Sequence, residues 1–241
     1  MTHTPPLVAA KRLNTPLPLN IKIQPGANPT RTRQAFSLKE MKRILTTAPL
    51  DYEPYLTVRF YTGIRNGEIE ALKWKHVDFE RRRLLIRETC IKGRCLKIPV
   101  SLQRTIVMSD EVYAAFRQQW ARTGNPSGWV FLNPAGNPLS LFYVTRHIWQ
   151  PLIRDSGLSR RSVSQTRHTT VVLWLSAGKS PEWMAQQLGI GSMCVFFKIY
   201  FSLFLGPINQ HADTLTCAVL LNNESSGNRF LKPVQSSGSV L

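Results

Sequence analysis

The sequence is short of acidic residues, of paired cysteines and of long apolar runs. The four cysteines (Cys90, Cys95, Cys194 and Cys217) contain no CxxC pair and have no histidine cluster near them. Neither a zinc site nor a disulfide framework is therefore indicated. No apolar run approaches the roughly twenty residues that span a bilayer, and no secretory signal opens the chain. These absences predict a soluble protein of a reducing cytosol that uses neither a metal nor a membrane.

The shortage of negative charge is the strongest compositional signal. The chain has 14 Asp and Glu against 31 Lys and Arg in 241 residues, which gives a formal net charge of +17 and a pI of about 10.3. An excess of this size is typical of proteins that bind nucleic acid. The basic residues are spread along the chain instead of forming one tail, as expected for a folded surface that faces phosphates.

The length favours one main domain with extensions, because ordinary domains hold about 100–200 residues. Residues 1–35 are rich in Pro, Asn, Thr and basic groups, and they predict an extended or disordered basic arm. Residues 206–241 predict a largely disordered C-terminal tail, and a docking helix for self-association is the alternative. The domain itself is expected over residues 36–205.

Helix signals dominate this domain. Ser37 and Glu40 have the spacing of a capping box and predict a helix that starts at Ser37. Further helices are expected over 53–61, from 66 through 74, over 110–123, over 141–158, and as a pair over 165–200 broken at 177–181. Residues 83–89 and 104–108 predict strands, with another short strand within 128–140. The predicted fold is mostly α with a small antiparallel β-sheet.

Three motifs place polar groups at turns or helix ends. The stretch YTGIRNGEIEALKW sets Arg65 between two glycines at a turn that opens a helix, where backbone amides and the helix dipole favour an anion. The stretch Gln165-Thr166-Arg167-His168 opens a later helix, and Lys198-Ile199-Tyr200 follows the last one. Taken singly, each motif has a plainer interpretation, as an exposed arginine in a turn or a tyrosine packed in a core.

Taken in order, the motifs resemble those of the tyrosine recombinases, the phage-type integrases. The matching pieces are Thr62–Glu68, Gln165–Thr169, and Leu188-Gly189 followed by Lys198–Tyr200. The resemblance covers about Phe36 to Leu205. It implies a catalytic domain that acts on double-stranded DNA through a 3′-phosphotyrosyl intermediate, without a metal or other cofactor, in the cytoplasm of a bacterial or phage-infected host cell.

The resemblance also implies roles for individual residues. Tyr200 corresponds to the nucleophile, and Arg65 and Arg167 correspond to the two arginines that bind the phosphate. Two planar guanidiniums suit this role, because phosphoryl transfer depends mainly on positioning and on stabilising charge at the nonbridging oxygens.

A lysine on the sheet hairpin protonates the leaving oxygen in this family. Lys97 is favoured over Lys92 because it lies nearer the expected hairpin tip, and a solvated strand lysine is the plainer interpretation of either. Lys92, Arg94 and His168 are assigned to DNA binding. His168 adjoins Arg167 as in the family pattern, where a structural role is favoured over a catalytic one.

The sequence departs from the family pattern at two expected catalytic positions. Ser164 stands where the first histidine is usual, and Ile190 stands where the second is usual. Isoleucine cannot donate a hydrogen bond, and loss of a positioned donor, acid or base typically costs about a hundred- to ten-thousandfold in rate.

The segment before Phe36 is also shorter than the N-terminal helical module of the family. The sequence thus predicts a truncated or impaired site-specific recombinase. A noncatalytic DNA-binding remnant of a prophage integrase is the alternative, and the sequence leaves open whether the chain is an active enzyme.

Overall fold

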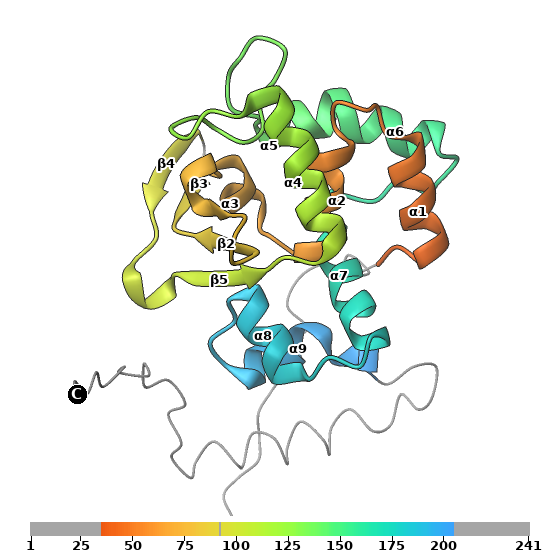
Figure 1. Ribbon diagram of the computed structural model, residues 1–241. Coiled ribbons are helices and arrows are strands. Elements are labelled where there is room, and N and C mark those ends of the chain that lie inside the picture. The colour runs from red at the N-terminus through yellow and green to blue at the C-terminus, as the bar shows by residue number, and fades with distance from the viewer. Residues whose placement is uncertain (1–34, 92, 205–241) are drawn as a thin grey trace, which may run out of the picture. The chain divides into compact units, whose positions relative to one another are not determined.

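The computed structural model describes residues 35–91 and 93–204. The predicted tail (206–241) with its alternative role in self-association, Lys92, and all but the last residue of the predicted arm (1–35) lie outside this range. The described residues belong to one unit of the chain, in which helices pack around small antiparallel sheets (Figure 1). This arrangement confirms the predicted fold class.

The first helices begin where the sequence predicts. Helix α1 (Leu38–Thr47) starts with a capping box, in which the Glu40 amide donates to Ser37 Oγ at 3.2 Å and the Ser37 amide donates to Glu40 Oε2 at 2.8 Å. Helix α2 (Glu53–Thr62) is buried along most of its length and packs against α1, α4 (Asp110–Thr123) and α7 (Gln165–Ser176). Helix α2 is therefore the central element of the main core.

Helix α3 (Asn66–Glu70) is shorter than predicted, and a 3₁₀ turn, η1 (Trp74–His76), follows it. The backbone between them pairs with a distant segment instead of continuing the helix. The Trp74 amide donates to the Gly128 carbonyl and the Val130 amide donates to the Leu72 carbonyl, both at 3.0 Å. The strand predicted within 128–140 is correspondingly absent from the described residues, where only isolated bridges form.

The strands form two small antiparallel sheets. One has the order β1 (Val77–Asp78), β2 (Arg83–Ile86), β5 (Arg104–Val107), and the other is the hairpin of β3 (Glu88–Ile91) and β4 (Arg94–Lys97). The strand predicted over 83–89 is thus two strands that meet at Arg87. A 3₁₀ turn, η2 (Val100–Leu102), connects the hairpin towards β5.

The β3–β4 hairpin also contains a disulfide that the sequence analysis did not predict. Cys90 and Cys95 are directly opposite each other in the antiparallel register, and their sulfurs are bonded. The cysteine spacing lacks any CxxC signature, so the pairing becomes evident only once the register of the hairpin is known.

The predicted helix over 141–158 is a continuous run of α5 (Leu141–Tyr143), the π-helical η3 (Val144–Trp149) and α6 (Gln150–Asp155). The last predicted helix is instead two helices, α8 (Pro181–Leu188) and α9 (Met193–Phe204), separated at Gly189. Tyr200 consequently lies inside α9, not after it.

The buried apolar side chains form two clusters. The larger one surrounds α2, and the smaller one joins α7, α8 and α9 through Val171, Met184, Ala185, Leu188, Phe196 and Tyr200. In Figure 1, these three helices lie together below the sheets. Among the residues that the structure describes, no helix is long and apolar enough to cross a membrane.

Candidate active site

The C-terminal turn of α8 is the centre of the candidate site. The Ile190 amide donates to the Ala185 carbonyl at 2.9 Å, and the Gly189 amide donates to the Gln186 carbonyl at 3.1 Å. Gly189 has φ 65°, so this is a Schellman motif with glycine in its left-handed position. The next three carbonyls, of residues 187–189, need partners from outside the helix.

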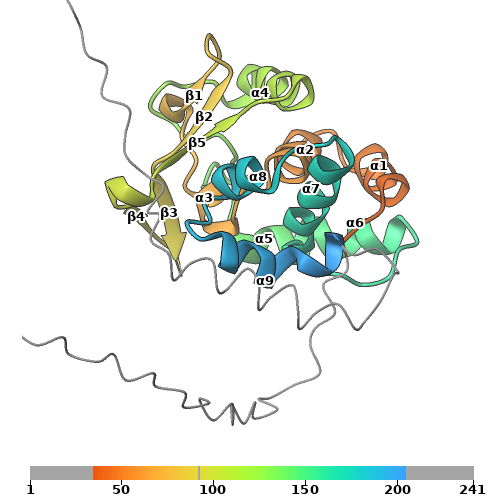
Figure 2. The ribbon, with the colours of Figure 1, turned by 90° about the horizontal axis from the view of Figure 1, so that it is seen from below.

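Three arginines supply those partners. Arg104 Nε donates to the Gln187 carbonyl at 2.9 Å, Arg167 Nη2 to the Leu188 carbonyl at 2.8 Å, and Arg65 Nη2 to the Gly189 carbonyl at 2.9 Å. They come from β5, from α7 and from the residue before α3, and Figure 2 shows α8 lying among these elements. The partial negative charge of a helix C-terminus favours such cations.

Glu68 links two of these arginines. Its carboxylate accepts a bond from Arg65 Nη1 at 2.9 Å, from the Arg65 amide at 2.8 Å, and from Arg104 Nη1 and Nη2, each at 2.7 Å. The Glu68 side chain is 3% exposed. Burial alone would raise the pKa of Glu68, but the bonds from Arg104, with those from Arg65, outweigh burial and lower it to about 2.

Arg167 brings the tyrosine into this network. Its Nη1 donates to the Gly63 carbonyl, and burial lowers the pKa of Arg167 to about 10. Tyr200 acts in the opposite direction on that pKa, and Arg65 acts in the same direction as burial, so both groups lie within electrostatic range. A pKa of about 10 leaves the guanidinium charged at neutral pH. The structure therefore places Arg65 and Arg167 at the end of the same helix, with Tyr200 within electrostatic range of Arg167.

Tyr200 is enclosed within the smaller apolar cluster and is 2% exposed. The centroid of its ring lies 5.2 Å from that of Phe196 and 5.3 Å from that of His168. His168 is partly buried and lies against the tyrosine ring, a position that suits support of the tyrosine.

Ser164 occupies an exposed position immediately before α7 and is held by Asn66. Asn66 Nδ2 donates to Ser164 Oγ at 3.1 Å, while the buried Arg59 donates through Nη2 to Asn66 Oδ1. Because Arg59 binds the amide oxygen of Asn66, the amide nitrogen is the end that points to the serine. Because Ser164 Oγ accepts from the amide, its own proton remains available to another acceptor.

Ile190 has a structural role in this turn. It follows the left-handed glycine of the Schellman motif, where an apolar residue commonly packs back on its helix, and its side chain packs against the smaller apolar cluster. The side chain has no hydrogen-bond donor at the position where the resemblance implies a histidine.

Comparison with known proteins assigns this arrangement to a family. Residues 34–201 match the phage integrase family. The chain belongs to this family. It is 26% identical over 171 residues to a protein described as defective, IntQ of Escherichia coli (strain K12), with 59% of this chain and 43% of IntQ covered. It is also 24% identical over 165 residues to the prophage integrase IntR of the same strain, with 58% and 40% covered.

Solved structures show that the fold is shared. The integrase of transposon Tn1549, in complex with a circular intermediate DNA, superposes with a TM-score of 0.65 at 17% identity, over 80% of this chain and 66% of that one. The XerA recombinase superposes with a TM-score of 0.59 at 20% identity, over 88% and 70%. This integrase-family chain spans less than half the length of IntQ and IntR.

The hairpin residues are positioned next to the site but are not joined to it. Helix α3 packs closely on β3 because Gly67 has no side chain. A Cβ at this position would clash with the Cys90 carbonyl oxygen. Arg94 and Lys97 lie on β4, all of which is exposed. Arg94 is next to the turn of the hairpin, whereas Lys97 pairs with Glu88 at the opposite end, so the expectation that Lys97 lies near the hairpin tip was wrong. Among the described residues, no hydrogen bond or ion pair connects Lys97 with the network of Arg65 and Arg167.

Sequence reasoning missed two members of the network. Glu68 is three residues after Arg65, and this capping-box spacing was a usable signal for its bond to the Arg65 amide. Arg104 had no such signal, because a lone arginine at the start of a strand is ordinary. Its role becomes visible only where β5 meets α3 and α8.

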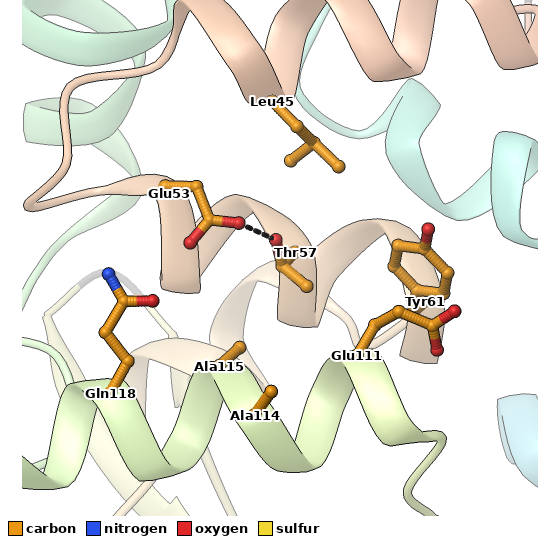
Figure 3. A pocket seen from close by; sticks show the side chains of 8 residues that line it. All are labelled: Leu45, Glu53, Thr57, Tyr61, Glu111, Ala114, Ala115 and Gln118. Carbon is orange, nitrogen blue, oxygen red and sulfur yellow. Dashed lines mark hydrogen bonds between the residues drawn. The ribbon is translucent and has the colours of Figure 1, made fainter.

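A separate pocket of about 260 Å³ lies between α1, α2 and α4 (Figure 3). Its wall includes Glu53, Tyr61 and Glu111, and Thr57 Oγ1 donates to Glu53 Oε1 at 2.7 Å. None of the predicted site residues lines this pocket. Within the described part of the chain, no group of His, Cys, Asp and Glu is arranged to hold a metal ion.

Proposed function

We propose that this chain binds double-stranded DNA and that its site is built for site-specific strand transfer through a phosphotyrosyl intermediate. The observation that carries the proposal is that Arg65 and Arg167 bind adjacent carbonyls at the C-terminal turn of α8, while Tyr200 shares an apolar cluster with Leu188 of that turn. We place the activity in the cytoplasm of a bacterial or phage-infected cell, in keeping with the prophage integrase to which the chain is similar.

The proposed step is an in-line displacement at phosphorus. The Tyr200 oxygen gives up its proton to solvent water and forms a bond to phosphorus, and the bond from phosphorus to the 5′ oxygen breaks. Lys97 gives that oxygen a proton, so a 5′-hydroxyl leaves. The phosphotyrosyl bond retains the energy of the phosphodiester. The 5′-hydroxyl of another cleaved strand can therefore attack the phosphorus and displace the Tyr200 oxygen, without a nucleotide cofactor.

Arg65 and Arg167 have different environments that suit two parts of this task. The Arg65 side chain is 46% exposed and keeps N–H donors beyond its bonds to Glu68 and Gly189. Arg167 is largely desolvated beside Tyr200, where a fixed positive charge stabilises negative charge that develops on the phenolic and phosphoryl oxygens. Arg94 would contact DNA from β4, and we assign the same role to Lys92.

The second candidate function is noncatalytic DNA binding, and two observations favour it. Tyr200 is 2% exposed, so its hydroxyl must become accessible before it can meet a phosphate. Ile190 supplies packing in place of a hydrogen-bond donor. Both features lower the rate of strand transfer, and neither reduces the positive net charge that attracts DNA.

A covalent-trapping gel with a pool of nicked duplexes separates the two functions. The native protein is run beside Ile190→His and Tyr200→Phe, after circular dichroism has shown that all three fold. An adduct from the native protein that disappears in Tyr200→Phe supports strand transfer by the present residues. An adduct from Ile190→His alone shows an impaired recombinase. DNA binding without an adduct from either protein supports the noncatalytic alternative.

A further inference from the structure

Arg104 belongs to none of the sequence motifs, yet it connects three elements of the site. It starts β5, binds both oxygens of Glu68 on α3, and donates to the Gln187 carbonyl at the end of α8. Its side chain is 7% exposed, so it cannot contact DNA directly without a rearrangement. We propose that Arg104 is a positioning residue that keeps Arg65 available for a DNA phosphate. This inference rests on the proposed function.

The argument begins with the capacity of the Glu68 carboxylate. A carboxylate has about four lone-pair sites, and Glu68 accepts two bonds from the Arg104 side chain, one from the Arg65 side chain and one from the Arg65 amide. Arg104 thereby saturates Glu68. The Arg65 side chain donates only one hydrogen bond to the carboxylate and remains 46% exposed.

Loss of the two bonds from Arg104 would leave Glu68 with too few donors. Glu68 is buried, and a buried carboxylate requires compensating donors. The nearest remaining guanidinium is that of Arg65, which already donates one bond to it. A two-pronged pair between them is the preferred geometry of arginine and carboxylate. It would withdraw the second nitrogen of Arg65 from Gly189 and from a phosphate.

Arg104 also holds the turn to which Arg65 binds. A Cβ at Gly189 would lie 2.8 Å from Arg104 Cδ, so the arginine stem packs directly beneath the residue whose carbonyl accepts from Arg65. The Arg104 side chain thus has two roles. It limits the number of hydrogen bonds that Glu68 accepts from Arg65, and it supports the Gly189 carbonyl, which orients Nη2 of Arg65.

The test is a double-mutant cycle between Arg65→Ala and Arg104→Lys. Lysine keeps the charge but is a single point donor, which cannot bind both carboxylate oxygens and the Gln187 carbonyl together. Binding of a labelled short duplex is measured by fluorescence anisotropy over a range of salt concentrations. Arg65→Ala should lower the slope of log affinity against log salt by about one unit, the contribution of one phosphate contact. Arg104→Lys should cause a similar loss, and the double variant should lose no more than Arg65→Ala alone.

Arg161→Lys is the matched control. Arg161 also binds the carboxylate of a capping-box glutamate, Glu40 of α1, and its side chain is 10% exposed. Its effect should add to that of Arg65→Ala. If Arg104→Lys is likewise additive, Arg104 has only a structural role and the inference is overturned. If Arg65→Ala alone changes nothing, the proposed phosphate contact fails, and the positioning role fails with it.

If Arg104→Lys does not fold, a second variant tests the same proposal. The double substitution Glu68→Gln with Arg104→Met removes both charges, and such paired replacement of a buried ion pair is tolerated better than removal of one partner. With no carboxylate to compete for it, Arg65 should still contribute about one unit of slope. Loss of the Arg65 contribution in this folded variant would contradict the proposal.

Discussion

At the scale of single residues, Glu68 shows how a buried charge depends on its partners. Its four hydrogen bonds come from only two arginines, and they hold its pKa at about 2 against the ordinary 4.5. A carboxyl whose pKa is lower in the folded than in the unfolded protein contributes stability above the unfolded pKa. That contribution disappears as the pH falls through the folded pKa.

We therefore expect Glu68→Gln to flatten the pH dependence of stability between about pH 4.5 and pH 2. In the native protein, protonation of Glu68 over this range should remove about 3 kcal/mol of the free energy of unfolding. Urea unfolding of both proteins across this range measures the effect. Glu40 and Glu88, whose pKa values are also lowered, titrate in both proteins and cancel in the difference. Parallel curves would show that the Glu68 pKa is not depressed.

At the scale of elements, the ends of α7 and α8 use the same motif in different surroundings. In α7, the Lys179 amide donates to the Trp174 carbonyl and the Gly178 amide to the Leu175 carbonyl, the pattern that Ile190 and Gly189 repeat in α8. Gly178 has φ 69° and Gly189 has φ 65°. A Cβ at Gly178 would meet nothing within 4 Å, whereas one at Gly189 would meet Arg104.

This pair separates backbone strain from damage to the site. Gly178→Ala should cost about 1 kcal/mol, the penalty of the left-handed conformation for a residue with a Cβ. Gly189→Ala should cost at least about 1 kcal/mol more, because Arg104 must move from its packed position. Denaturant unfolding gives both values. Equal losses for the two variants would mean that Arg104 adapts without cost and does not support the turn.

At the scale of the whole molecule, the net charge of +17 determines how the protein should meet DNA. Binding that releases counterions from phosphates weakens steeply with salt. Arg167 binds α8 through a neutral carbonyl, and Arg65 and Arg104 share the single negative charge of Glu68, so the cluster keeps a net positive charge that adds to that attraction.

Affinity for a random-sequence duplex should accordingly fall about a hundredfold or more between low and physiological salt, the loss expected for several phosphate contacts. Titration of a labelled duplex at several chloride concentrations measures this. A nonionic solute at matched osmolality should leave the affinity unchanged. Binding that is indifferent to salt would argue against a phosphate-facing surface.

The sequence predicted those features that depend on local signals. The capping box at Ser37 and the span of α4 are properties of neighbouring residues, and the structure reproduces them. The early end of α3 was missed because residues 72–74 bond to residues 128–130. The division between α8 and α9 was missed although Leu188-Gly189-Ile190 contains the glycine and the following apolar residue of a Schellman motif.

By itself, the sequence determined the fold class, the basic charge and the family to which the chain belongs. The fold class and the family follow from periodicity and short motifs, which lie in neighbouring residues, and the charge is a sum over the chain that needs no knowledge of the fold. Only the tertiary structure decided that Arg65, Arg104 and Arg167 share the end of one helix, that Glu68 is saturated, and that Tyr200 is enclosed. The physical reason is that hydrogen-bond partners for the final carbonyls of a helix must come from other elements, and sequence distance carries no record of which elements meet there.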